Sequence, residues 1–285
     1  MPAPPPPAKA PPGADAQKLV FAQSVCAAAV RRQGSKVHVG CRGCPPFGEA
    51  SPLPDGTIAE NPAVFRELAA VHAGAFTGAG ADQALLQLSG CHSMDDGGSG
   101  SVLVEKVESS WHYRPLLLLP EISAYQCVVF GAPSGAVLVC LDRFASGGHT
   151  RDTIVAHRFV AGVPPKHERE SLVTANSMAD AACGYVGMDI VGAEIRAMTA
   201  KDVDADGVAD LRLDVSYSMS KADERRDRKL EALCRAIRPG IDRTPTERFM
   251  PKATRATVDF RFDGRRFVPT AGAAEWVDKL PGPYR

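Results

Sequence analysis

The chain has 285 residues, of which 45% are apolar and 23% charged, and a chain of this size can bury a real hydrophobic core. Its formal net charge is zero, which argues against a general attraction to nucleic acid or to an anionic membrane. No apolar run approaches the roughly 18–20 residues that a membrane-spanning helix needs, so no transmembrane segment is predicted.

The first residues are rich in proline and lack the apolar stretch of a signal peptide. This composition favours extended polyproline II, so we predict a disordered tether over residues 1–14. A mature chain whose signal peptide has been removed would begin in this way. So would a surface lipoprotein with a lipid tether upstream, and both alternatives stay open.

Eight cysteines are scattered along the chain, and this even number favours disulfides. Cys41 and Cys44 form a CxxC pair, but no second pair and no histidine pair at zinc spacing accompany them. Disulfides imply an oxidising compartment, so we predict an exported protein that is periplasmic, on the outer surface or secreted. The alternative is an intracellular protein with reduced cysteines.

Apolar residues recur at helical spacing from Asp15 to Gln33, which predicts an N-terminal helix that ends at Gly34. Residues 41–62 are rich in proline, glycine and polar side chains and predict a loop. We expect the whole segment 15–62 to form a helix and a cysteine-rich loop that cap a β-rich domain.

From about residue 70 to 218 the pattern changes to short alternating segments separated by turn residues. The predicted strands are Ala84–Leu88, Ser101–Val107, Tyr113–Leu119, Tyr125–Phe130, Ala136–Leu141, Thr153–Val160, Asp189–Ala197 and Asp210–Tyr217. Their spacing is typical of an all-β fold rather than of βαβ units. We therefore predict a mainly β fold of short antiparallel strands, propeller-like or alternatively a β-sandwich, in a single domain over residues 15–285.

One disulfide can be predicted from hairpin geometry. The segment Tyr125–Asp142 reads as strand, turn and strand, and the midpoint between Cys127 and Cys140 lies in the turn. A non-hydrogen-bonded cross-strand pair has about the Cα spacing that a disulfide bridges, which predicts a Cys127–Cys140 bond. The turn also explains Ser134 better than its superficial likeness to a serine-protease motif does, and no catalytic residue is predicted.

Two polar segments follow along the chain. His167–Glu170 comes after two prolines and predicts a solvated loop. An inserted helix is predicted near 220–239, because Ser220 and Asp223 resemble a capping box and a Pro-Gly pair stops the pattern. Its charge-dense first turns predict a solvated face.

The chain closes with a predicted hairpin, in which an Asp-Gly pair between alternating segments favours a type I′ turn. In that register Phe260 faces Phe267 toward the core, and Arg261 faces Arg266 toward water. A short terminal helix is predicted over Thr270–Leu280.

The segment Asp202–Asp210 carries an acid at every second position up to a glycine, Gly207, that follows the third acid. A tight loop turns such side chains toward one cation, and hard oxygen ligands in this number suit Ca²⁺ better than Mg²⁺. The predicted ligands are the carboxylates of Asp202, Asp204, Asp206 and Asp210 and the carbonyl of Val208. Calcium is therefore the predicted cofactor, and an acidic, solvated turn is the alternative.

Residues 202–211 resemble the calcium-binding loop of FG-GAP repeats in integrin-like β-propellers, whose pattern is Asp-x-Asp-x-Asp-Gly-x-x-Asp-Leu before a strand. The resemblance covers ten residues and implies a calcium site and a propeller-like β repeat, although dockerins and thrombospondin-type repeats use similar loops. An EF-hand would need a bidentate glutamate where Leu213 stands, and the alternation after the loop predicts a strand instead of a helix.

These features predict an exported, calcium-stabilised domain that binds or scaffolds a protein or glycan at the cell surface. No nucleic-acid partner is expected. The alternative is an extracellular hydrolase whose structural calcium holds a loop near the active site.

Overall fold

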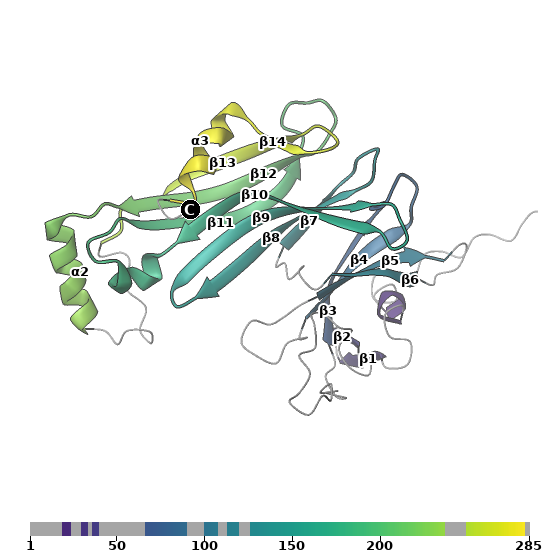
Figure 1. Cartoon of the computed structure of the whole chain (residues 1–285), viewed down its shortest axis with the longest axis horizontal. Helices are drawn as coiled ribbons and strands as arrows, with labels where there is room; N and C mark the ends of the chain where they lie inside the picture. Colours follow the sequence, from purple (N-terminus) through teal and green to yellow (C-terminus); the bar gives the residue numbers. More distant parts are fainter. Residues whose placement is uncertain are drawn as a thin grey trace, which may run out of the picture. The chain divides into compact units, whose positions relative to one another are not determined.

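The computed structural model describes residues 19–23, 30–33, 36–39, 66–89, 100–107, 113–119, 126–236 and 249–282. The chain divides into two compact units, the first of Met1–Ala73 and Asp82–Ser123 and the second of Gly74–Ala81 and Ala124–Arg285. Each unit holds one sheet in which strands that follow one another along the chain are neighbours (Figure 1). The predicted tether at 1–14 and the Cys41–Cys44 loop lie outside the described residues.

The first unit holds a six-stranded sheet. Its strands are β1 (Val30–Gln33), β2 (Lys36–Val39), β3 (Arg66–Gly74), β4 (Gln83–Ser89), β5 (Gly100–Lys106) and β6 (Tyr113–Leu119). A short helical stretch at 19–23 packs on this sheet, where Phe21 is buried in one cluster with Leu86 and Val102.

The predicted N-terminal helix is wrong at its C-terminal end, because residues 30–33 form β1 and pair with β2. Val30 lies opposite Val39, and Gln33 lies opposite Lys36. Val30 fits both the helical spacing and the strand alternation, so the apolar pattern alone does not separate the two. The β-branched valines of both segments favour the strand.

The second unit holds an eight-stranded sheet in the order β14-β13-β12-β11-β10-β9-β8-β7. Its strands are β7 (Gln126–Phe130), β8 (Val137–Ser146), β9 (His149–Val160), β10 (Lys166–Ser177), β11 (Ile190–Lys201), β12 (Asp210–Ser220), β13 (Thr254–Phe262) and β14 (Phe267–Pro269). In the described part of this unit, η1 (Ala179–Tyr185) follows β10, α2 (Glu224–Ala236) follows β12 and α3 (Ala271–Lys279) follows β14.

The predicted mainly β fold with antiparallel strands is confirmed, and each of the eight predicted strands corresponds to a strand of the structure. The strands in the described ranges form two meandering sheets of six and eight members. This arrangement fits the sandwich alternative better than a propeller, whose blades are four-stranded sheets repeated around a channel.

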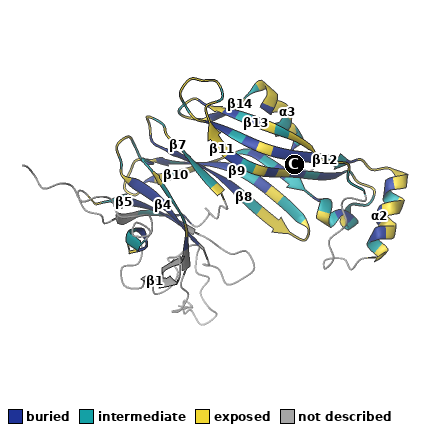
Figure 2. Cartoon of the chain, turned by 180° about the vertical axis from the view of Figure 1, so that it is seen from behind, coloured by how far each residue is buried: buried dark blue, intermediate teal, exposed yellow. Residues whose placement is uncertain are grey.

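The eight-stranded sheet curls around an apolar core. On β12, Leu211, Leu213 and Val215 are buried in this core, and Figure 2 shows how buried and more exposed positions alternate along the strands. At the two edges of the sheet, the ring of Phe130 on β7 lies 4.9 Å from the ring of Phe267 on β14. The edges therefore meet through aromatic side chains on the inner face.

Where the backbone pairing between β10 and β11 ends, side-chain hydrogen bonds attach β11 to the sheet instead. Among the described residues, these two strands pair at Ser177 and Gly192 alone. Further along β11, the fully buried carboxylate of Asp152 accepts a hydrogen bond from the Ile195 backbone N–H at 2.9 Å. The Arg143 guanidinium binds this carboxylate at 2.7 and 2.9 Å and donates to the Ile195 carbonyl at 3.2 Å. This ion pair, in which Asp152 is buried and the Arg143 side chain is 37% exposed, therefore joins β8 and β9 to β11.

The segment His167–Glu170 is largely solvated, as predicted, but it is not a loop, because it begins β10 and pairs with β9. Charged residues occupy both faces of the first half of β10, which is largely exposed. The sequence therefore shows no apolar alternation there. The alternation appears only further along, where Val173 and Ala175 enter the core.

The closing hairpin forms in a different register from the predicted one. Phe262 lies opposite Phe267, so Phe260 is not the partner of Phe267. The carboxylate of Asp263 accepts hydrogen bonds from the backbone N–H groups of Arg265 and Arg266, both at 2.8 Å, and this closes a longer loop. The predicted register would have placed Arg265 opposite the buried Phe262, whereas the observed register stacks two phenylalanines there.

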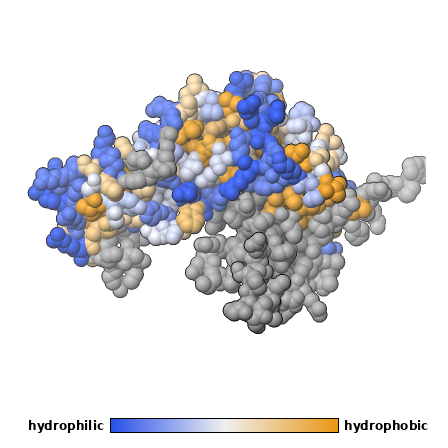
Figure 3. Space-filling model, viewed as in Figure 1, coloured by the Kyte–Doolittle hydropathy of each residue, from blue (hydrophilic) through white to orange (hydrophobic). Residues whose placement is uncertain are grey.

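The inserted helix near 220–239 is present as α2, but its cap is Asp223 and not Ser220. The Asp223 carboxylate accepts a hydrogen bond from the Arg226 backbone N–H at 2.8 Å, whereas Ser220 ends β12 and donates to the Phe249 carbonyl. Hydrophilic side chains cover much of α2 (Figure 3). Arg226 is an exception to the predicted solvated face, since it is buried and donates to the Met188 carbonyl at 2.8 Å.

Candidate metal centre

The acidic loop connects β11 to β12. The last residue of β11, Lys201, lies opposite the first residue of β12, Asp210. A strand follows the loop, as predicted from the alternation of Leu211 and Leu213, so the loop is not part of an EF-hand. Gly207 has a φ of 85°, a left-handed conformation that glycine adopts without steric cost. The loop is thus a hairpin turn in which Ala205, with a φ of 62°, and Gly207 both adopt the left-handed conformation.

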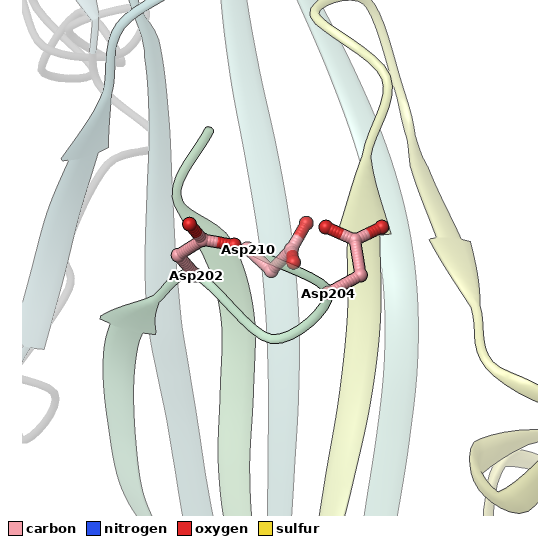
Figure 4. A group of neighbouring side chains, drawn as sticks. All are labelled: Asp202, Asp204 and Asp210. Atoms are coloured by element: carbon pink, nitrogen blue, oxygen red, sulfur yellow. The ribbon is translucent and has the colours of Figure 1, made fainter. Parts of the chain in front are cut away.

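Three of the predicted metal ligands come together in this loop. One carboxylate oxygen each from Asp202, Asp204 and Asp210 lies within 4.8 Å of the other two (Figure 4). Asp202 and Asp204 are exposed, and Asp210 is buried. Oxygen atoms at this spacing could hold one metal ion, because three ligands at about 2.3–2.6 Å from a Ca²⁺ ion lie within such a distance of one another.

Asp210 also has a role in the fold. One of its carboxylate oxygens accepts a hydrogen bond from the Val203 backbone N–H at 3.0 Å, and the other accepts one from the Phe262 backbone N–H at 2.7 Å. The first bond closes the loop, and the second ties the loop to the end of β13. Each oxygen keeps a second lone pair, so these bonds leave room for a metal ion.

The remaining predicted ligands take part in contacts inside the loop. Asp202 accepts a hydrogen bond from the Gly207 backbone N–H at 3.0 Å. Asp206 is exposed and accepts one from the Val208 backbone N–H at 2.8 Å, while Val208 packs against the core with its side chain. Asp206 and the Val208 carbonyl therefore lie in the same turn as the three gathered carboxylates and stay predicted ligands.

Arg261 on β13 supplies a cation next to the loop. Its guanidinium Nε lies 2.6 Å from a carboxylate oxygen of Asp204. The predicted pairing of Arg261 with Arg266 is wrong, since Arg261 lies opposite Val268. An arginine at this distance offsets part of the repulsion among the acids and would compete with a metal ion for Asp204.

Two disulfides lie in the second unit. The predicted Cys127–Cys140 bond is confirmed, with the two residues directly opposite in the β7–β8 hairpin. Cys183 of η1 is bonded to Cys234 of α2, a pairing between elements 51 residues apart that the sequence pattern does not indicate. None of the helices in the described ranges is long and apolar enough to cross a membrane.

The sequence pattern also did not indicate a histidine pair formed by the buried His157 and the half-buried His167. The Nδ1 atom of His157 lies 3.0 Å from the Nε2 atom of His167, across β9 and β10. Burial, and to a lesser extent His167 and Arg169, lower the pKa of His157 from its usual 6.5 to about 3. His157 is therefore neutral at physiological pH, and the hydrogen bond needs only one proton between the two rings.

This histidine predicts a loss of stability in acid. Because the folded state binds the proton only near pH 3 and the unfolded chain near pH 6.5, stability is full above pH 6.5 and falls toward pH 3. Between pH 7.5 and pH 5 we expect His157 to remove about 2 kcal/mol from the free energy of unfolding. Urea unfolding of the wild type and of His157→Gln at both pH values measures this difference. Equal pH dependence in the two proteins would contradict it.

The chain matches no protein-family model, no curated protein and no solved structure. Because one fold can host many functions, the functional proposal has to come from the sites of this chain.

Proposed function

We propose that this protein is an exported binding or scaffolding domain that a Ca²⁺ ion in the loop Asp202–Asp210 stabilises. The observation that carries the proposal is the gathering of three carboxylate oxygens within 4.8 Å at the end of a β-hairpin. The two disulfides support an oxidising compartment. The partner would be a protein or a glycan at the cell surface.

Calcium is the preferred ion because of the ligand chemistry and the shape of the loop. All candidate ligands are oxygen atoms, which favours a hard cation over zinc or copper. Several carboxylates in one exposed turn suit the larger coordination number of Ca²⁺, whereas Mg²⁺ keeps more of its water. The ion would link the loop to β12 through Asp210 and act as a structural staple.

Calcium is expected to raise the melting temperature of the full chain, and EDTA to lower it. An ion that binds only the folded state adds about 2.7 kcal/mol at a concentration one hundred times its Kd, which corresponds to a shift of several degrees. Differential scanning calorimetry with Ca²⁺, with Mg²⁺ and with EDTA measures the effect. Identical melting temperatures in calcium and EDTA would exclude a stabilising calcium.

Variants of the loop make the test specific. Asp202→Asn removes a candidate ligand on an exposed side chain and should abolish the response, whereas Glu168→Gln on β10 should keep it. Arg261→Gln should bind calcium more tightly than the wild type, because the guanidinium no longer competes for Asp204. An unchanged calcium response in Asp202→Asn would place the ion elsewhere.

The alternative function, an extracellular hydrolase with a structural calcium, makes the same prediction for the metal. Activity on an extracellular polymer is the measurement that separates the two functions.

A further inference from the structure

Two aromatic rings and a lysine meet where α3 packs beside β12. The rings of Tyr217 on β12 and Trp276 on α3 are nearly perpendicular, at 84°, with centroids 6.4 Å apart. The ammonium of Lys279 lies 4.9 Å from the Tyr217 centroid and 4.7 Å from the Trp276 centroid. One cation therefore occupies the corner between two π faces, at distances where cation–π attraction operates.

The two rings are held in place by contacts that do not involve Lys279. Tyr217 is only 9% exposed and belongs to the core of the curled sheet, and its hydroxyl lies 3.5 Å from the sulfur of Met219. Helix α3 carries Trp276 and is fixed by Ala273 and Leu280, which are buried in the same core. The corner is therefore preorganised before a cation enters it.

Lys279 is a replaceable occupant of this corner. It stands in the last turn of α3, and its ammonium forms no ion pair with a residue in the part of the chain that the structure describes. A flexible lysine stem can leave such a position without disturbing the backbone, because all its movement is in side-chain torsions. The contact with the rings is worth little at a partly exposed site, so another cation can take its place.

We propose that Tyr217 and Trp276 form a recognition site for an alkylammonium group, and that Lys279 occupies this site in the absence of the ligand. Perpendicular aromatic rings around a cation are the arrangement by which proteins recognise quaternary ammonium groups. The ligand is a choline-type headgroup or an N-methylated lysine side chain, which share this chemistry. The site lies toward the opposite end of β12 from Asp210 and does not depend on a metal in the loop.

The alkylammonium site can be tested by fluorescence of the full chain in a Trp111→Phe background, where Trp276 is the single tryptophan. Choline is titrated into the wild type and into Lys279→Ala, at constant ionic strength. We expect a saturable change in fluorescence, and binding several-fold tighter in Lys279→Ala, because the internal competitor is gone. The neutral carbon analogue 3,3-dimethylbutanol has the same shape and should bind roughly tenfold more weakly.

Two controls separate this site from a purely structural contact. Lys279→Arg keeps a cation in the corner and should bind choline as weakly as the wild type, and Tyr217→Leu should remove saturable binding. If Lys279 only anchors α3, Lys279→Ala shows no saturable response to choline, and the proposal is overturned. Equal binding of choline and its neutral analogue would also overturn it. A titration with Nε-trimethyllysine is then compared with the choline titration. Tighter binding of Nε-trimethyllysine indicates a methylated lysine side chain as the ligand, and tighter binding of choline indicates a choline-type headgroup.

Discussion

Replacing Asp152 by alanine should lower the free energy of unfolding by about 2–4 kcal/mol, since a buried backbone N–H and the Arg143 guanidinium lose an acceptor. The Asp152 carboxylate is fully buried and serves both the Arg143 guanidinium and the Ile195 backbone N–H. Its loss would leave that N–H without an acceptor and would remove two hydrogen bonds of Arg143, whose side chain is 37% exposed, in the stretch where β10 no longer pairs with β11. Urea unfolding at pH 7 measures the effect.

Two comparisons show whether the effect comes from the buried charge. Glu168→Gln removes an exposed ion pair with Lys166 on β10 and should change stability by less than about 1 kcal/mol. The double variant Arg143→Met with Asp152→Leu should be more stable than Asp152→Ala, because leucine fills the buried space that alanine leaves empty. If Asp152→Ala loses no more stability than Glu168→Gln, then the side chains of β8 and β9 do not hold β11.

Replacing Asp210 by alanine should lower the free energy of unfolding by about 2–4 kcal/mol even in EDTA, since two backbone N–H groups lose their acceptor. The carboxylate is 1% exposed and accepts hydrogen bonds from Val203 and Phe262. Asp206→Ala is the matched control, because Asp206 is an exposed acid of the same loop and should cost less than about 1 kcal/mol in EDTA. Urea unfolding with chelator present makes the comparison independent of any metal.

The outcome for Asp210 separates two roles of one carboxylate. A large loss in EDTA for Asp210→Ala, together with a calcium response that Asp202→Asn abolishes, would mean that Asp210 serves both the fold and the ion. Equal stabilities of Asp210→Ala and Asp206→Ala in EDTA would contradict a role of Asp210 in the fold. In that case the acid would matter for the metal alone.

Local patterns predicted the elements that apolar runs and turn residues mark clearly. The strands around Cys127 and Cys140 are apolar runs that flank a short turn, so both the hairpin and its disulfide follow from counting residues. The charged start of β10 was missed because its side chains carry no apolar alternation, and its pairing with β9 comes from the tertiary structure. The register of the closing hairpin depended on which residue lies opposite the buried Phe262. Packing in the core favours Phe267 at that position.

The sequence by itself determined the spacing of the acids in Asp202–Asp210, the strand after them and the Cys127–Cys140 pairing, because each depends on residues close together in the chain. Only the tertiary structure decided that Arg261 lies against Asp204, or that a carboxylate of β9 holds β11. Such contacts join residues far apart in the chain, and they form only once the folded sheet has brought their strands and loops together.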